Sequence, residues 1–237
     1  MLMISASSLE NSSRFWHHGR VLSLTHLEDG ALSRLPMFPL PGGVLFPGQT
    51  MSLYVFEPRY RALMRACLAE NHAMAVSFLE SESQSGAPVR TICGGGQIIA
   101  SEELEDGCWN VLLQGTDRLR IVTEVPTDEP FRRVEVQRFM ESRGPNDQAL
   151  AGQLRTLMLQ ISEVLPDAQS LLHGLAGLAK SPSHLCDLVG AHIVDPAELR
   201  QELLETRSVE ERLERTIGAM SSALLHLIDL PESGALH

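Results

Sequence analysis

The chain has 237 residues, 43% of them hydrophobic, and a formal charge of −11 at pH 7. This length can bury the core of one or two domains without disulfides or structural metals. The acidic balance argues against nucleic acid as a partner, because phosphate would be repelled everywhere except at a local basic patch, and the basic residues are scattered.

The first 34 residues are rich in serine and contain no apolar run of the length that a signal peptide requires. No other window approaches the roughly 20 apolar residues of a membrane span. The four cysteines are widely spaced without a C-x-x-C pair, a pattern typical of reduced, buried thiols. We therefore expect a cytoplasmic protein that contacts no membrane, with residues 1–34 as a poorly ordered leader or an artefact of the assigned start.

The next segment, residues 35–47, is apolar but repeatedly interrupted by proline. Proline lacks a backbone donor, so a strand here must lie at a sheet edge or be broken by bends. The prolines are Pro36, Pro39, Pro41 and Pro47. We expect an irregular first strand.

A helix is predicted to follow the β-rich run at residues 51–56. Glu57 and Pro58 mark its start, because proline suits the first helical position and a carboxylate suits the positive end of the helix dipole. Apolar residues then recur at helical spacing, which predicts one buried face. These residues are Tyr60, Leu63, Met64, Cys67 and Leu68.

Further strands are expected up to residue 139. Residues 73–79 form an apolar run suited to a buried strand, followed by a polar loop at 80–88. Residues 89–100 contain three consecutive glycines, which indicate a strand with a bend or bulge.

The last strands are predicted from composition and alternation. Residues 109–113 and 119–125 flank a glycine-containing segment with the composition of a hairpin turn. A final strand is indicated by apolar residues that largely alternate, namely Phe131, Val134, Val136 and Phe139. About six strands with short connections and one inserted helix predict a partly closed antiparallel β-domain.

Beyond a linker at residues 142–147 the pattern becomes helical. Three helix starts are marked by Ser181 before Pro182, by Asp195 with Glu198, and by Ser208 with Glu211; the last two have the spacing of a capping box. In the last helix apolar residues follow a 4-3-4-3 spacing, at Leu213, Ile217, Met220, Leu224 and Leu227. This seam predicts either the core of an intramolecular bundle or a homodimer contact.

Three segments together resemble the N-terminal, substrate-binding domain of Lon proteases, over roughly residues 35–228. The first is the proline-rich strand followed by Phe-Glu-Pro-Arg-Tyr at residues 56–60, and the second is Gly-x-x-Arg-x-x-Ile at residues 115–121. The third is the helical half, with Leu185-x-Asp187, Leu203-Leu204-Glu205 and Arg212-Leu213. The motif residues with an expected structural role are Glu57, Pro58, Arg59, Tyr60, Gly115 and Arg118.

This resemblance implies an α+β fold: a PUA-like or Lon-like antiparallel pseudo-β-barrel of about six strands with one inserted helix, followed by a C-terminal α-helical bundle. The implied domains are residues 35–140 and 149–230, with a tail at 231–237. Arg59 and Arg118 are expected to pair with carboxylates such as Glu57 or Asp117, or to line a binding rim.

The sequence lacks the chemical signatures of the complete protease. No G-x-x-x-x-G-K-[ST] phosphate-binding motif and no serine–lysine arrangement is present, and Lys180 is the only lysine. The chain ends where the ATPase of this family would begin. His184, Cys186, Asp187 and His192 form the best grouping of metal-ligand types, but their spacing matches no zinc pattern. We therefore expect no catalytic residue, cofactor or metal.

The resulting hypothesis is a stand-alone, non-catalytic protein that binds unfolded or degradation-prone polypeptide, or that contacts a protein partner in proteolysis. An irregular sheet edge leaves backbone groups and apolar side chains available to an extended peptide. The candidate peptide contacts are Leu45, Phe46, Met51 and Tyr54, with core packing as the alternative for each. Two other classes stay open: a hydrolase with an unrecognised site, and a PUA-like nucleic-acid binder.

Overall fold

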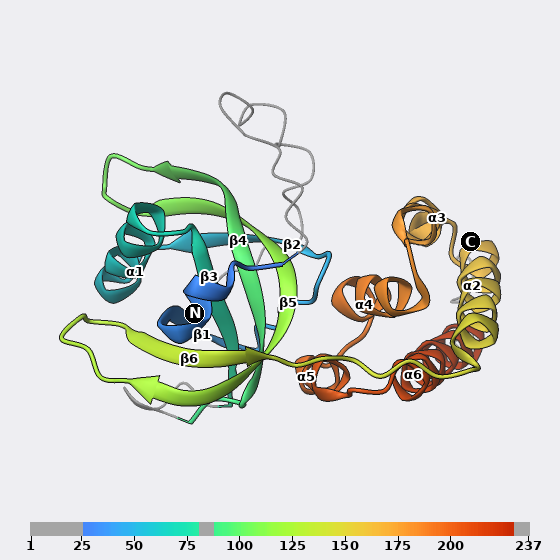
Figure 1. Cartoon of the computed structure of the whole chain (residues 1–237). Helices are drawn as coiled ribbons and strands as arrows, with labels where there is room; N and C mark the ends of the chain where they lie inside the picture. The colour runs from blue at the N-terminus through green and yellow to red at the C-terminus, as the bar shows by residue number, and fades with distance from the viewer. Residues whose placement is uncertain (1–25, 81–87, 230–237) are drawn as a thin grey trace, which may run out of the picture. The chain divides into compact units, whose positions relative to one another are not determined.

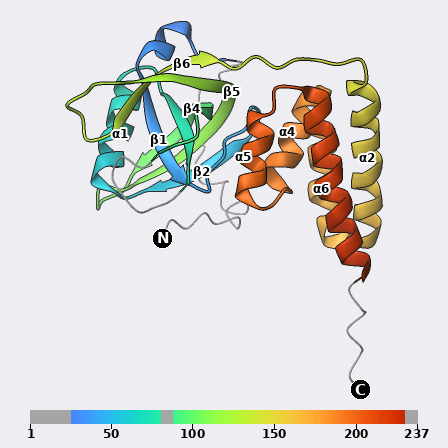
Figure 2. The same cartoon turned by 90° about the horizontal axis from the view of Figure 1, so that it is seen from below.

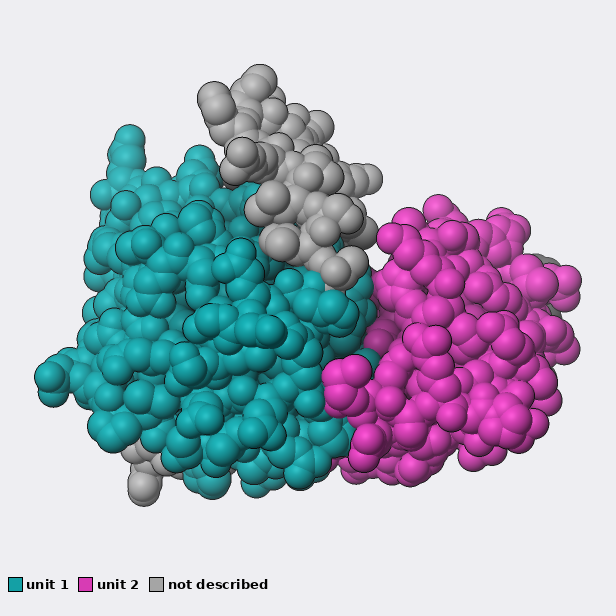
Figure 3. All heavy atoms as spheres, in the orientation of Figure 1, with its two compact units in different colours: residues 1–139 teal, residues 140–237 magenta. Residues whose placement is uncertain are grey.

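The computed structural model describes residues 26–80 and 88–229 (Figure 1). These residues divide into two compact units, with the boundary between Phe139 and Met140 (Figure 3). The expected loop at 80–88 and the tail at 231–237 fall almost entirely outside the described residues. None of the helices that the structure describes combines the length and the hydropathy needed to cross a bilayer.

The first unit contains the predicted six strands, the inserted helix and a short 3-10 helix. The elements are η3 (Asp29–Ser33), β1 (Leu35–Pro41), β2 (Thr50–Val55), α1 (Pro58–Ala69), β3 (Ala73–Leu79), β4 (Ile92–Glu103), β5 (Trp109–Val125) and β6 (Arg132–Arg138). Helix α1 begins at Pro58 as predicted, and its face with Tyr60, Leu63, Met64 and Cys67 is buried against the sheet.

The six strands form one sheet in the order β2-β5-β4-β3-β1-β6, and β6 also pairs with β5. The sheet therefore closes on itself through β5, with β2 attached outside the ring (Figures 1 and 2). The expected sheet was antiparallel throughout, but β1 and β3 pair in parallel. Helix α1 lies in the connection between these strands and allows them to run in the same direction.

The predicted hairpin at residues 109–125 is wrong, because β5 is one continuous strand. Gly115 lies within it, and a Cβ atom there would be 2.0 Å from the carbonyl oxygen of Phe46. The Gly115 N–H donates to the Gln49 oxygen at 2.8 Å, and its own oxygen accepts from Gly48 N–H at 2.9 Å. The glycine thus permits a close backbone approach rather than a turn. The predicted irregularity in β4 is confirmed as a register shift between Gly95 and Gly96.

Part of the expected leader belongs to the folded first unit. The buried carboxylate of Asp117 accepts hydrogen bonds from His26 Nδ1 at 2.8 Å and from Leu27 N–H at 2.7 Å. Leu27 and Ala31 are buried in a second apolar cluster of this unit. Residues 26–34 are therefore part of the folded unit, whereas residues 1–25 of the expected leader lie outside the described residues.

The second unit is helical. Its elements are α2 (Asp147–Val164), η4 (Pro166–Ala168), α3 (Gln169–Leu178), α4 (Pro182–His192), α5 (Ala197–Glu205) and α6 (Val209–Asp229). Helices α2 and α6 lie side by side (Figure 2). The last helix buries Leu213 and Met220 in this unit's own core and packs Ile217 and Leu224 against it. The seam therefore serves an intramolecular bundle, and a homodimer stays a prediction.

Two of the three predicted helix caps form. The Ser181 side chain accepts from His184 N–H at 3.1 Å, and Ser208 Oγ accepts from Glu211 N–H at 3.3 Å. The third cap is wrong: Pro196 is the N-cap of α5, so Asp195 lies one residue too early and its carboxylate is instead 3.4 Å from Arg200 Nη1.

Candidate functional site

An exposed pair of aromatic side chains stands at the end of β2. In this strand Leu53 and Val55 point into the core, while Tyr54 is 45% exposed. Phe56, which follows the strand, is 42% exposed, and the two rings stack with centroids 6.2 Å apart. Across the described residues β2 pairs with β5 alone, so its other edge has no strand partner there. An exposed aromatic pair beside a strand edge is typical of an interaction surface.

The four predicted peptide contacts fall into two groups. Leu45 and Phe46 are fully buried, so both are core residues and present no surface. The main-chain oxygen of Phe46 lies directly against Gly115. Met51 is partly buried against the core, and only Tyr54 exposes its ring. Phe56 was not predicted as a peptide contact, because Glu57 and Pro58 indicate a helix start directly after it. The strand period of two, extended by one step beyond Tyr54, would have placed Phe56 on the same face.

The turn between β4 and β5 adjoins this aromatic pair. Interaction with the Cys108 thiol raises the pKa of Tyr54, and the charge of the Asp106 carboxylate raises it further. Asp106 accepts from Cys108 N–H at 2.9 Å, and this bond lowers the pKa of Asp106. Arg61 on α1 donates to the Asp106 main-chain oxygen at 3.0 Å. Asp106 therefore lies in a defined turn that is held against α1.

The motif residues of the first unit have structural contacts. Arg59 pairs with Glu57 at 2.8 Å, which is one of the pairings expected from the sequence. Its guanidinium also lies 4.5 Å from the Tyr60 ring centroid. Arg118 is buried, with its guanidinium 5.9 Å from the Phe46 ring centroid. Asp117 was expected to pair with Arg59 or Arg118, but its carboxylate contacts His26 and Arg138 instead.

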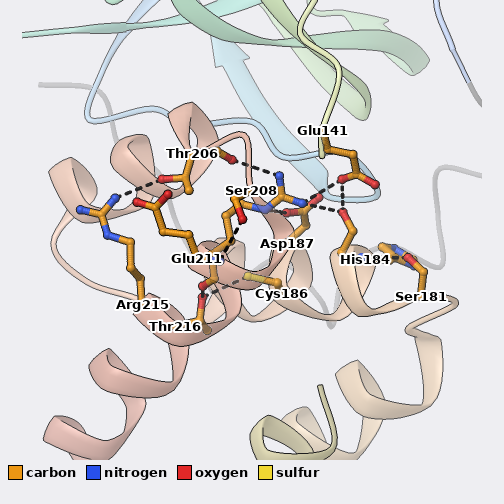
Figure 4. A network of polar contacts seen from close by, with 12 residues as sticks. Glu141, Ser181, His184, Cys186, Asp187, Thr206, Ser208, Glu211, Arg215 and Thr216 are labelled. Atoms are coloured by element: carbon orange, nitrogen blue, oxygen red, sulfur yellow. Dashed lines mark hydrogen bonds and ion pairs between the residues drawn. The ribbon is translucent and has the colours of Figure 1, made fainter. Parts of the chain in front are cut away.

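The helical unit contains a buried polar network around Arg212 (Figure 4). Arg212 is fully buried and donates to the Glu141 carboxylate at 2.9 Å, to Ser183 Oγ at 2.6 Å and to the Thr206 main-chain oxygen at 3.2 Å. Its Nε lies 3.8 Å from the Asp187 carboxylate. Burial alone would lower the pKa of Arg212, but Asp187 and Glu141 outweigh it and raise that pKa.

This network has a structural role. It joins Glu141, at the start of the unit, to α4 and α6, and the neighbouring Ser142 donates to the Arg207 oxygen and accepts from Val209 N–H, each at 3.0 Å. The sequence named Asp187 and Arg212 as separate motif residues, and the structure brings them together.

The residues of the best grouping of metal-ligand types have separate contacts. Cys186 Sγ lies 3.1 Å from Thr216 Oγ1, Asp187 faces Arg212, and His184 Nδ1 accepts from Lys180 N–H at 3.2 Å. In residues 26–80 and 88–229, no three His, Cys, Asp or Glu side chains converge as a metal site requires. The four cysteines are free and buried, as predicted, and burial raises the pKa of Cys67 and of Cys93 to about 12.

Fold and surface together define an α+β protein with a closed β-unit, an exposed aromatic edge and a helical bundle. A family model described as the ATP-dependent protease La (LON) substrate-binding domain matches residues 34–222. The chain belongs to this family, which confirms the resemblance found in its motifs.

Individual relatives agree with this assignment. A Lon protease of Solibacter usitatus is 30% identical over 202 residues, which cover 81% of this chain and 24% of the relative. The N-terminal domain of a Mycobacterium avium complex Lon protease matches 80% of this chain and 98% of that domain at 19% identity, with a TM-score of 0.67. The Lon N-terminal domain protein from Xanthomonas campestris matches 78% of this chain and 98% of that one at 24% identity, with a TM-score of 0.56. The chain spans about a quarter of the length of the curated relatives it matches.

Proposed function

We propose that the first unit binds unfolded polypeptide in an extended conformation along the edge of β2 that faces away from β5. The observation that carries this proposal is the stacked, exposed Tyr54–Phe56 pair beside that edge. An added strand would gain main-chain hydrogen bonds, and the aromatic rings would hold its apolar side chains. The name of the matching family, a substrate-binding domain of an ATP-dependent protease, supports the same direction. Binding would then recruit polypeptides for proteolysis.

The affinity should be modest. Main-chain pairing is independent of sequence, and a surface that accepts many sequences cannot be complementary to each of them. A dissociation constant on the order of micromolar is therefore expected.

The test compares a reduced, unfolded model polypeptide with its folded form by fluorescence anisotropy. We expect the unfolded form to bind preferentially. Tyr54→Ala with Phe56→Ala should weaken binding about thirtyfold, because truncated aromatic contacts each cost about 1 kcal/mol. Val122→Ala is the control, since Val122 is an exposed apolar residue on the other half of β5. Equal binding by the parent and the double variant would overturn the proposed surface.

A further inference from the structure

The surface around the aromatic pair is acidic. Tyr54 lies opposite Asn110, and Asn110 lies opposite Glu102, so that these three residues form a row across β2, β5 and β4. Residues directly opposite in antiparallel strands share one face, and two strand spacings place Glu102 about 10 Å from Tyr54. Glu102 is exposed and accepts from Asn110 Nδ2 at 3.3 Å. The outward face beside the pair therefore carries a fixed carboxylate.

The β4–β5 turn adds charge on the adjoining side. Asp106 is exposed and accepts from Cys108 N–H, which lowers its pKa, and its charge raises the pKa of Tyr54. An aspartate with a lowered pKa is ionised at neutral pH. Glu105 precedes it in the same turn and is also exposed. Two sides of the aromatic pair are thus negatively charged.

The arginines of α1 offset part of this charge. Arg59 pairs with Glu57 at 2.8 Å, and Arg65 pairs with Glu103 at 2.7 Å. Arg61 bonds the main chain of the turn instead of a carboxylate. Residues 57–65 and 102–106 together contain five carboxylates and three guanidinium groups, which leaves an excess of two negative charges.

We propose that this surface selects extended polypeptide segments in which arginine or lysine accompanies apolar residues. The inference rests on the proposed function and names its substrate class. A guanidinium can lie over the exposed face of Tyr54 or Phe56 while it approaches Glu102 or Asp106, so ring and carboxylate recognise the same side chain. The formal charge of −11 attracts basic segments from a distance and repels acidic ones.

The test uses three unstructured peptides of equal length with the same apolar and aromatic residues, flanked by arginine, serine or glutamate. Binding to the full chain is measured by fluorescence anisotropy at low and at high salt. We expect the arginine peptide to bind about tenfold more tightly than the serine peptide at low salt, the glutamate peptide to bind most weakly, and the differences to shrink at high salt.

Variants assign the preference to this surface. Glu102→Gln with Asp106→Asn should reduce the ratio of arginine-peptide to serine-peptide affinity to about threefold or less, because both carboxylates that attract the arginine are removed. The ratio is used because a general loss of binding would lower both affinities equally. Asparagine at 106 keeps an oxygen that can accept from Cys108 N–H. Asp128→Asn with Glu135→Gln removes the same charge from exposed positions in the β5–β6 region and should preserve the ratio.

Each outcome decides one question. Binding that is independent of peptide charge overturns this inference and leaves the proposed function intact. Equal effects of the two double variants show that net charge, and not this surface, sets the preference, which also overturns the inference. Failure of all three peptides and of the unfolded polypeptide to bind overturns the proposed function itself.

Discussion

Arg212 shows how a single buried charge can fix the start of the helical unit. The side chain is fully buried, and removal of one member of a buried ion pair leaves its partners desolvated without compensation. Asp187 is buried beside it, and Glu141 comes from the chain segment that precedes α2. The orientation of that segment therefore depends on the guanidinium.

Arg212→Met is expected to lower the free energy of unfolding of the helical unit by about 3–5 kcal/mol, because Asp187 and Glu141 lose the positive charge that they share. Urea unfolding followed by far-UV circular dichroism measures this change. Arg143→Met is the control: Arg143 also faces Glu141, at 3.7 Å, but its side chain is 78% exposed, and an exposed pair contributes less than about 1 kcal/mol. Indistinguishable midpoints for the two variants would contradict the structural role of Arg212.

Residue identity alone could not locate this network. Asp187 and Arg212 were recognised as motif residues, but 25 positions separate them in the sequence, and their contact depends on the packing of α4 against α6. For Leu45, Phe46 and Tyr54 the sequence allowed the same two interpretations, a peptide contact or core packing. Tyr54 is exposed and the other two are buried, a difference that the sequence could not predict because apolar residues in an irregular segment have no periodicity to assign a face.

At the scale of elements, the sequence predicted the helix starts and strand bounds that depend on neighbouring residues. Helix α1 begins at the predicted Pro58, and strand β3 has the predicted bounds. The division of β5 into a hairpin was wrong, because Gly115 is required by the approach of Phe46 from a distant segment, and composition cannot separate this requirement from a turn. The parallel pairing of β1 with β3 is likewise set by tertiary topology.

Helix α4 provides a pH-dependent element. Burial lowers the pKa of His184, Lys180 lowers it further, and Asp187 opposes the change. The neutral ring is also required locally, because Nδ1 accepts from Lys180 N–H and cannot do so when protonated. Since the pKa in the folded state lies below that in the unfolded state, the contribution of His184 to stability is complete above about pH 6.5 and is lost as the pH falls.

We therefore expect the urea midpoint of the helical unit to be lower at pH 5.5 than at pH 7.5, and His184→Gln to reduce this difference. His173→Gln is the matched control, because His173 lies exposed on α3 and its replacement should leave the difference unchanged. If His184→Gln behaved like the control, the pH dependence would belong to another group, such as His192, whose pKa is also lowered by burial.

At the scale of the whole molecule, the apolar residues form separate cores. Two clusters lie within the first unit, and a third lies within the helical unit. Cooperative unfolding requires shared buried contacts, so a substitution in one core should act mainly on the unit that contains it.

Gly115→Ala and Leu154→Ala test this independence. The first substitution places a Cβ atom 2.0 Å from the Phe46 oxygen, and the second leaves a cavity at a fully buried position of α2 that should cost about 2–5 kcal/mol. Hydrogen exchange measured by mass spectrometry should show faster exchange of β4 and β5 alone for Gly115→Ala, and of α2 and α6 alone for Leu154→Ala. Gly152→Ala on α2 is the control. Apart from the backbone of its own helix turn, the new Cβ would meet no atom within 4 Å, and alanine should slightly stabilise the helix. Faster exchange in both units after either substitution would show that the two units unfold as one, and the effects of Arg212→Met would then extend to the edge of β2 where we propose that peptide binds.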